Sequence, residues 1–149
     1  MGAREAFTKE EQENIVSAIK KAELATSGEI RVHIEKKCSG DPLDSAAHWF
    51  AKLDMHKTEL RNGVLIYLAT EDRKFAVIGD VGINQKVPSD FWDSTKQKMI
   101  DHFRNDALSK GLILGIEEAG KQLKSYFPWK TDDINELSDE ISFGDEIKK

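Results

Sequence analysis

The chain has little cysteine, little proline and no long hydrophobic run, and each shortage excludes a class of protein. Cys38 is the only cysteine among 149 residues, so an internal disulfide framework is excluded and a reducing compartment is expected. Three prolines and ten glycines exclude a collagen-like or low-complexity chain. No apolar run approaches the roughly 18 residues of a membrane span, and no apolar leader opens the chain. We therefore expect a cytoplasmic protein without membrane contact.

Clustered positive charge is also missing. The chain carries 22 Lys+Arg and 27 Asp+Glu, which gives a net charge of −5. The acidic excess lies in residues 131–149, so the body, residues 1–130, is close to neutral. Nucleic acids and anionic membrane surfaces both require clustered lysine and arginine, and neither is expected as a partner. The sequence predicts a single domain over residues 1–130 and an acidic C-terminal tail over 131–149.

Hydrophobic periodicity predicts alternating helices and strands. Strict alternation indicates a half-buried strand at 30–34, and the continuous apolar run at 64–69 indicates a strand covered on both faces. A short polar turn separates that strand from another at 75–78, so these two are expected to form a hairpin. The fold class that follows is α/β, a three-layer α/β/α sandwich with a small mixed β-sheet and a right-handed first crossover. Helices are expected at 9–25, with a capping box of Thr8 and Glu11, at 44–55, and in two segments after Ser89 and from Leu108 to Leu123.

The acidic tail alternates carboxylates with apolar residues. Its charge predicts a mobile or loosely docked strap. Its apolar side chains offer an anchor on the domain or a contact for a protein partner. These side chains are Ile134, Leu137, Ile141 and Phe143.

The common catalytic signatures are absent from the sequence. There is no GxxxxGK[ST], no GxGxxG after a strand, no HExxH and no EF-hand loop. Cys38 has no arginine six residues later, which a cysteine-phosphatase loop requires. The four histidines fall on different elements without ligand spacing. No catalytic residue is predicted.

Acidic residues converge in the predicted topology. Two parallel strands followed by an antiparallel third bring residues 28–29, 59–63 and 79–80 to one edge of the sheet, where two loops cross. Carboxylates packed without basic partners raise each other's pKa or recruit a cation, and hard oxygen ligands suit calcium. The candidate ligands for Ca²⁺, or for Mg²⁺ or another divalent metal, are Glu29, Glu59, Asn62, Asp80 and Asp90.

Two alternatives compete with this metal site. In the first, Glu59 pairs with Arg61, Glu29 pairs with Arg31 or a lysine, and Asp80 caps the turn at 79–82. In the second, a ligand binds beyond the carboxyl ends of the parallel strands, at the opposite edge. The residues there are Ser39, Gly40, Asp41, Glu71 and Asp72, although Asp41 also fits a helix cap and 71–73 a solvated turn.

Three segments in order, RNGVLIYLA at 61–69, EDRK at 71–74 and VIGDVGI at 77–83, resemble the TPM domain family, and the resemblance extends from about Phe7 to Trp129. It implies an α/β/α sandwich, divalent-metal binding near crossing loops in some members, and acid phosphatase activity in chloroplast relatives concerned with photosystem repair. Many relatives carry a signal peptide and a C-terminal membrane anchor. They often have Gly-Tyr-Gly-Leu-Glu where this chain has 79–83, which makes Asp80 a new candidate ligand.

The expected function is a non-enzymatic, calcium-responsive binding module, whose metal ties the two crossing loops together and regulates a partner surface. The alternative is a metal-assisted acid phosphatase acting on phosphomonoesters. In that alternative the ion polarises a phosphoryl oxygen and activates water, with a carboxylate as base. Arg61 and Lys86 are the nearest cations for phosphate.

Overall fold

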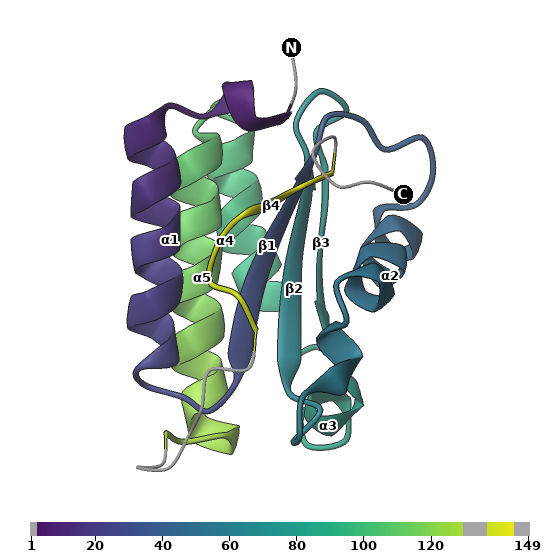
Figure 1. Ribbon diagram of the computed structural model, residues 1–149, viewed down its shortest axis with the longest axis vertical. Coiled ribbons are helices and arrows are strands. Elements are labelled where there is room, and N and C mark those ends of the chain that lie inside the picture. Colours follow the sequence, from purple (N-terminus) through teal and green to yellow (C-terminus); the bar gives the residue numbers. More distant parts are fainter. Residues whose placement is uncertain (1–2, 130–136, 145–149) are drawn as a thin grey trace.

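The structure is a computed structural model that describes residues 3–129 and 137–144, and these form a four-stranded sheet between two helical layers (Figure 1). The sheet has the order β3-β2-β1-β4. Its strands are β1 (Glu29–Glu35), β2 (Gly63–Ala69), β3 (Lys74–Gly79) and β4 (Ser142–Phe143). The predicted α/β/α sandwich with a small mixed sheet is confirmed.

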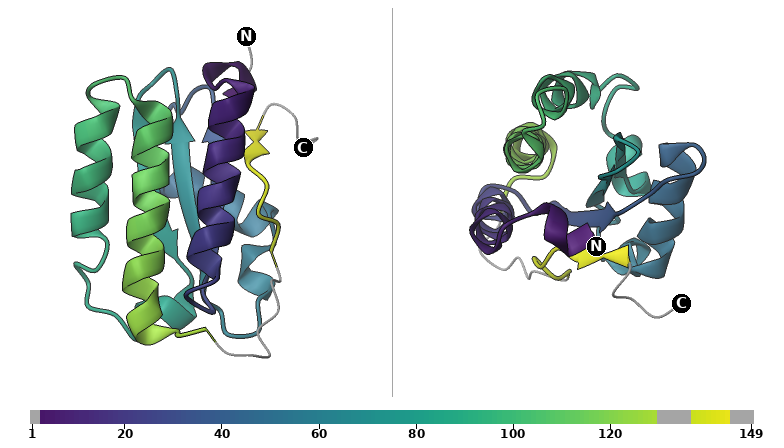
Figure 2. Two further views of the ribbon diagram at one scale, coloured as in Figure 1. Left: turned by 90° about the vertical axis from the view of Figure 1, so that its left-hand side faces the viewer. Right: turned by 90° about the horizontal axis from the view of Figure 1, so that it is seen from above.

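The helices are distributed unequally over the two faces of the sheet. Three of them cover one face side by side, in the spatial order α4, α5, α1 (Figure 2). The other face carries α2, and the short α3 lies at the lower end of the sheet in Figure 1. The helices are α1 (Lys9–Glu23), α2 (Pro42–Lys52), α3 (Val81–Asn84), α4 (Asp93–Phe103) and α5 (Leu108–Tyr126), with 3-10 turns η1 (Ala3–Ala6) and η2 (Met55–Lys57).

Strand pairing follows the predicted topology. β1 and β2 are parallel, with Glu29 opposite Gly63, and the connection between them runs through α2. β2 and β3 are antiparallel and form the expected hairpin, with Val64 opposite Gly79. All seven residues of β2 are buried, because helices cover both faces of the central strand. Alternate residues of β2 therefore enter two different cores.

The larger core lies under α1, α4 and α5, and the smaller one under α2. Val64, Ile66 and Leu68 point into the larger core, while Leu65 and Tyr67 point into the smaller one. This division reflects the two-residue period of a strand, which sends successive side chains to opposite faces.

Four local features of the chain differ from the expectation. Residues 79–88 contain α3 instead of being all loop, because Asp80 caps a helical turn there. α2 begins at Pro42 and ends at Lys52, because Asp41 is its N-cap and Pro42 suits the first turn. α4 begins at Asp93, with Trp92 at the N-cap position in place of Ser89. β4 was not predicted.

The capping box of α1 is confirmed. The backbone N–H of Glu11 donates to Thr8 Oγ1 at 3.0 Å, and the Thr8 N–H donates to Glu11 Oε1 at 2.8 Å. In the predicted tail, Leu137, Ile141 and Phe143 pack against the domain. Ile134 and the boundary at residue 130 lie outside the described residues.

Candidate functional site

Three separate chain segments meet at the lower edge of the sheet in Figure 1, as the sequence predicts. The Glu29 N–H donates to the carbonyl of Asn62 at 3.2 Å, which joins the start of β1 to the loop before β2. The Asp80 N–H donates to the carbonyl of Gly63 at 2.9 Å, which joins the end of β3 to the first residue of β2. Residues 28–29, 59–63 and 79–80 are therefore neighbours, and we call this region the crossing-loop edge.

The two loops cross in direct backbone contact. The Gly82 N–H donates to the carbonyl of Arg61 at 2.9 Å. A Cβ atom at Gly82 would collide with the carbonyl of Leu60 and lie 2.6 Å from that of Arg61, so only glycine fits here. Arg61 itself has φ 51°, an uncommon backbone conformation for a residue with a side chain. Close backbone contacts therefore fix the conformation of both loops at the crossing.

Asp80 lies at the centre of the crossing. Its side chain is 4% exposed, caps α3 by accepting the Val81 N–H at 2.7 Å, and accepts two hydrogen bonds from Arg61. The Arg61 Nε to Asp80 Oδ2 distance is 2.8 Å, and the second guanidinium nitrogen lies 2.9 Å from Oδ1. Hydrogen bonding to this carboxylate raises the pKa of Arg61 above its ordinary value. The Arg61 side chain is 44% exposed, so the cation covers a buried anion from the solvent side.

Glu29 and Asn62 are buried beside this pair. Glu29 is 4% exposed, and its Oε1 accepts the backbone N–H of Leu137 at 2.6 Å. Asn62 is 2% exposed, and its amide nitrogen donates to the carbonyl of Ser27 at 3.0 Å. Both side chains hold backbone segments together, and both keep oxygen atoms at the crossing-loop edge.

Glu59 and Asp90 are exposed in this structure. Glu59 belongs to the loop before β2, and Asp90 belongs to the segment between α3 and α4, where its carbonyl accepts the Asp93 N–H at 3.0 Å. Among the described residues, no three His, Cys, Asp or Glu side chains are grouped closely enough to hold a metal ion. The structure thus brings Glu29, Asn62 and Asp80 to one edge without assembling all five candidates into a cage, and the metal assignment stays a prediction.

Charge pairing at this edge combines features of the proposed alternatives. Asp80 caps the turn after β3, as the first alternative to the metal site predicts. Arg61, which that alternative paired with Glu59, makes its bidentate pair with Asp80. The sequence does not predict this partner for Arg61, because the two residues are 19 positions apart and meet only where the loops cross.

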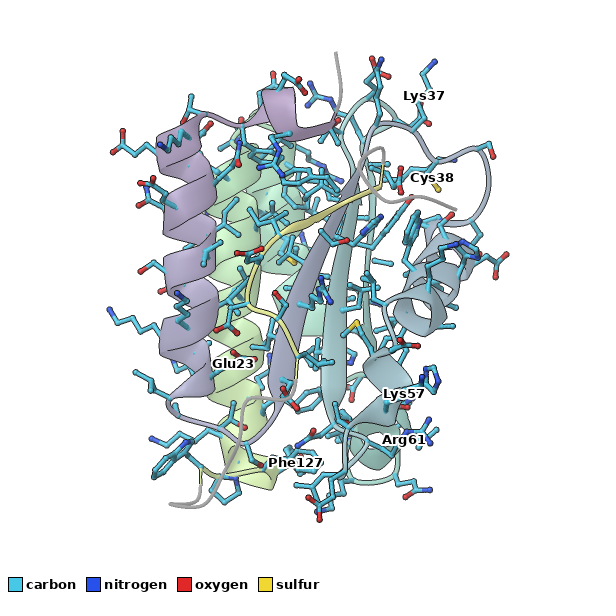
Figure 3. The ribbon with its side chains drawn as sticks, in the orientation of Figure 1. Glu23, Lys37, Cys38, Lys57, Arg61 and Phe127 are labelled. Carbon is cyan, nitrogen blue, oxygen red and sulfur yellow. The ribbon has the colours of Figure 1, made fainter. Side chains whose placement is uncertain are left out.

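At the opposite edge of the sheet, two loops are tied to each other. Asp72 Oδ2 accepts the Cys38 N–H at 2.7 Å, and Lys74 Nζ donates to the carbonyls of Cys38 and Gly40, each at 3.0 Å. Asp41 accepts the Leu43 N–H at 2.9 Å, which confirms its expected role as a helix cap. Figure 3 shows Cys38 at this end of the molecule and Arg61 at the other. The side chains of Asp41, Asp72 and Lys74 thus all form hydrogen bonds with backbone groups.

Two further polar clusters were not predicted from the sequence. His33 is fully buried, with Nδ1 2.8 Å from Ser142 Oγ and Nε2 2.8 Å from Glu35 Oε1, and its ring stacks on Trp49 at 4.0 Å. Glu23, at the end of α1, accepts the Ile30 N–H at 3.0 Å. In the sequence His33 falls among the polar residues of an alternating strand, so no sequence signal marks it as buried.

Comparisons with known proteins identify the family. The profile of the TPM domain matches residues 3–122 of this chain. The chain therefore belongs to the TPM domain family, as its resemblance implied. A comparison with functionally curated proteins gives no match.

Solved structures share the fold of this chain. The NMR structure of the BA42 protein from the psychrophilic bacterium Bizionia argentinensis is 51% identical, with a TM-score of 0.86 over 91% of this chain and 94% of that one. The N-terminal domain of the cg2496 protein from Corynebacterium glutamicum has the same fold at 13% identity, with a TM-score of 0.63 over 91% and 79% of the two chains. The N-terminal domain of a protein from P. gingivalis also has this fold at 17% identity, with a TM-score of 0.67 over 81% and 78% of the two chains.

Within residues 3–129 and 137–144, no helix has both the length and the hydrophobicity that crossing a bilayer requires. The cytoplasmic location expected from the sequence stays a prediction.

Proposed function

We propose that this TPM domain is a non-enzymatic module that binds a divalent cation, with calcium as its preferred ion, at the crossing-loop edge. The observation that carries the proposal is Asp80, a carboxylate buried where the two loops cross. Glu29 and Asn62 supply further oxygens at the same edge. Carboxylate and amide oxygens are the donors that calcium takes, so the donor atoms of these side chains are of the kind that suits the ion.

Arg61 has a specific role in this proposal. Its guanidinium already holds Asp80 with one positive charge, from a side chain that is 44% exposed. A divalent cation and this guanidinium compete for the same carboxylate oxygens. Arg61 therefore acts as a replaceable counter-ion, and its removal from Asp80 accompanies cation binding.

Cation binding at this edge acts on the two loops. Residues 58–62 form the loop before β2 and residues 80–84 follow β3, and the two segments contact each other through the Gly82 N–H and the Arg61 carbonyl. An ion that binds only the folded chain, at 100 times its dissociation constant, adds about 2.7 kcal/mol to stability. This is sufficient to fix loop positions and to change the surface that a protein partner meets.

The test is an amide NMR titration of the metal-stripped protein with CaCl₂ and then MgCl₂. We expect saturable shifts at 28–29, 59–63 and 79–90. Asp80→Asn abolishes these shifts, and Arg61→Gln increases calcium affinity by removing the competing cation. The matched control is Asp101→Asn, which changes an exposed aspartate on α4 and leaves calcium affinity at the wild-type value.

Three results would contradict the proposal. One is an absence of shifts up to millimolar calcium in both the wild type and Arg61→Gln. The second is calcium binding in Asp80→Asn at wild-type affinity. If Arg61→Gln only destabilises the fold, the Arg61 to Asp80 pair is structural and the metal assignment fails.

The second candidate function is a metal-assisted acid phosphatase acting on phosphomonoesters. It is favoured by Arg61, whose partly exposed guanidinium lies beside the proposed ion site and suits a phosphate group. The measurement is turnover of p-nitrophenyl phosphate by protein purified over several columns. Activity that is lost in Asp80→Asn supports this function, whereas equal activity in that variant removes it.

A further inference from the structure

The C-terminal segment of the chain lies along the outer edge of β1. We call residues 137–144 the strap, which runs beside β1 and α1 (Figures 1 and 2). It pairs with β1 as a strand over only two residues, at His33↔Ser142 and Ile34↔Phe143. Because this ladder is so short, side-chain contacts supply much of the attachment of the strap.

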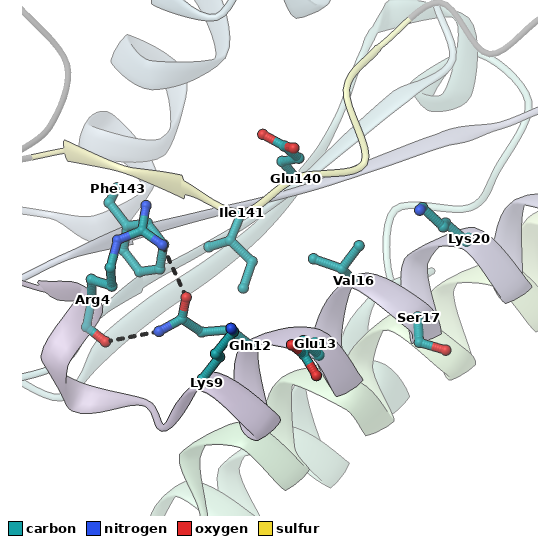
Figure 4. A pocket seen from close by; sticks show the side chains of 10 residues that line it. All are labelled: Arg4, Lys9, Gln12, Glu13, Val16, Ser17, Lys20, Glu140, Ile141 and Phe143. Atoms are coloured by element: carbon teal, nitrogen blue, oxygen red, sulfur yellow. Dashed lines mark hydrogen bonds between the residues drawn. The ribbon is translucent and has the colours of Figure 1, made fainter.

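Apolar contacts anchor the strap near both of its ends. Leu137 packs against the smaller core, and Phe143, which is 3% exposed, belongs to the larger one. Ile141 and Phe143 also line a groove of about 620 Å³ between the strap and α1 (Figure 4). Apolar contacts do not titrate, so the pH dependence of docking is set by the ionisable groups that lie between these anchors.

Two carboxyl groups meet between the anchors. Glu23 ends α1 (Figure 3), and its Oε2 accepts the Ile30 N–H at 3.0 Å. Its Oε1 is buried, and no N–H or hydroxyl group of the described residues donates to it. The side chain that hydrogen-bonds to Glu23 is that of Asp139 on the strap. Since both groups are carboxyls, this hydrogen bond exists only while one of them carries a proton.

Negative charge surrounds this pair. Burial raises the pKa of Glu23 to about 9, and Asp139 and Glu29 of β1 add to the shift, whereas the Ile30 N–H opposes it. Loss of the shared proton places two negative charges in contact, with the carboxylate of Glu29 as a third nearby. The strap carries one of the two, so ionisation of the pair repels the strap from α1 and β1.

Charged groups on the other neighbouring elements are engaged elsewhere. Arg31 of β1 interacts with Glu140 of the strap, which opposes the lowering of the pKa of Arg31 by burial. Glu117 and Lys121 of α5, which packs against α1, line a different groove together with Lys21. The ionisation of Glu23 therefore depends mainly on its burial, on Asp139 and on Glu29.

We propose that the strap docks on β1 with uptake of one proton, which Glu23 and Asp139 share, and that loss of this proton in mildly alkaline solution releases the strap. The strap is the part that moves, because Ile19 of α1 and Ile30 of β1 are fully buried in the larger core. Its release opens the outer edge of β1 and exposes His33, whose Nδ1 lies 2.8 Å from Ser142 Oγ. This change requires no bound cation.

The experiment follows hydrogen exchange of the full-length protein by NMR, in metal-free buffer from pH 7 to 9. The Leu137 N–H donates to Glu29, so its exchange rate, divided into the intrinsic rate at each pH, reports the ratio of docked to released strap. In the wild type we expect this protection to fall by about tenfold for each pH unit. His33 does not contribute over this range, because its pKa lies below 6.5.

Two variants remove the need for the proton. Glu23→Gln and Asp139→Asn each replace one carboxyl with an amide, whose N–H donates to the carboxylate that remains. In both variants we expect Leu137 protection to stay within about twofold from pH 7 to 9. The matched control is Glu13→Gln, which changes an exposed carboxylate of α1 beside the strap and should follow the wild type (Figure 4).

Three outcomes would overturn the proposal. The first is wild-type Leu137 protection that changes by less than about twofold between pH 7 and 9. The second is a pH dependence as large as that of the wild type in both Glu23→Gln and Asp139→Asn, which would assign it to other groups. The third is Leu137 protection equal to that of the β2 amides at every pH, because the strap would then leave only when the whole domain unfolds.

Discussion

The carboxylate of Glu29 joins the beginning of the first strand to the last described segment of the chain, because its Oε1 accepts the Leu137 N–H at 2.6 Å across 108 positions. Glu29 also starts β1 at the crossing-loop edge. The strap, residues 137–144, and the proposed cation site therefore share one buried carboxylate. A change in either of them is expected to affect the other through this residue.

The first prediction concerns this shared carboxylate. Glu29→Ala leaves the Leu137 N–H without its acceptor, and we expect the free energy of unfolding to fall by about 2–3 kcal/mol. Glu29→Gln keeps an acceptor oxygen and should lose less than half of that. Urea denaturation measures both changes, and hydrogen exchange at Leu137 should accelerate in the alanine variant alone. Unchanged exchange at Leu137 in Glu29→Ala would show that this hydrogen bond does not hold the strap.

The second prediction concerns the loop crossing. Gly82→Ala drives a methyl group into the carbonyls of Leu60 and Arg61, and backbone atoms cannot yield as a flexible side chain does. We expect a loss of about 2–4 kcal/mol of stability, in the range of strained or overpacked sites. Gly40→Ala, with open space around it, is the control and should change stability by less than about 0.5 kcal/mol. Equal midpoints for the two variants in thermal unfolding would refute the close crossing.

The third prediction uses Glu23. Burial raises its pKa to about 9, and nearby Asp139 and Glu29 add to the shift, while its hydrogen bond from the Ile30 N–H opposes it. The folded chain thus binds this proton more tightly than the unfolded chain, whose Glu23 has the ordinary value of 4.5. Its contribution to stability is full below pH 4.5 and is lost as the pH rises toward 9, by at most about 1.4 kcal/mol per pH unit.

Glu23→Gln removes this titration and keeps an oxygen for the Ile30 N–H. The variant should gain stability relative to the wild type as the pH rises from 5 to 8.5. Urea denaturation at several pH values measures the difference between the two proteins. A difference that stays constant with pH would show that Glu23 is ionised in the folded chain.

The fourth prediction concerns His33, whose contribution to stability changes with pH in the direction opposite to that of Glu23. Burial lowers its pKa below 6.5, and the neighbouring positive charge of Arg31 and the ring of His48 act in the same direction, whereas Glu35 opposes them. The folded chain binds this proton less tightly than the unfolded chain. The stability that neutral His33 provides is therefore full above pH 6.5 and is lost as the pH falls below that value.

NMR titration of the imidazole ring measures this pKa directly and separates it from the effect of Glu23. We expect an apparent pKa below 6.5 and changes at Ser142 over the same pH range, because the two side chains are hydrogen-bonded. His33→Gln should make stability less sensitive to acid between pH 6.5 and 5. A ring pKa above 6.5 would contradict the buried, neutral form.

Much of the fold was predictable because local patterns agree with tertiary structure. The uninterrupted apolar run of β2 has one simple explanation, a strand covered on both faces, and its seven buried residues confirm it. The capping box of Thr8 and Glu11 places the start of α1 through interactions three residues apart. Strand directions followed from the lengths of the connections, since a short polar turn favours a hairpin.

The details of the candidate site were less predictable. Topology placed Glu29 and Asp80 at one edge, but the choice of partner for Arg61 depends on its backbone at φ 51° and on the contact with Gly82. Neither feature has a periodic sequence signal. β4 was missed for a similar reason: Ser142 and Phe143 form a strand only because β1 offers its edge, and the surrounding acids resemble a solvated tail.

The parallel pairing of the strap with β1 has a consequence for synthesis of the protein. His33 leaves the ribosome 109 residues before Ser142, its partner on the outer edge. At typical elongation rates this interval is on the order of 5–20 s, longer than most single domains need to fold. During that time the nascent chain presents an unfinished sheet edge to chaperones and to neighbouring nascent chains. The residues made last therefore decide how long the first strand stays available to other molecules in the cell.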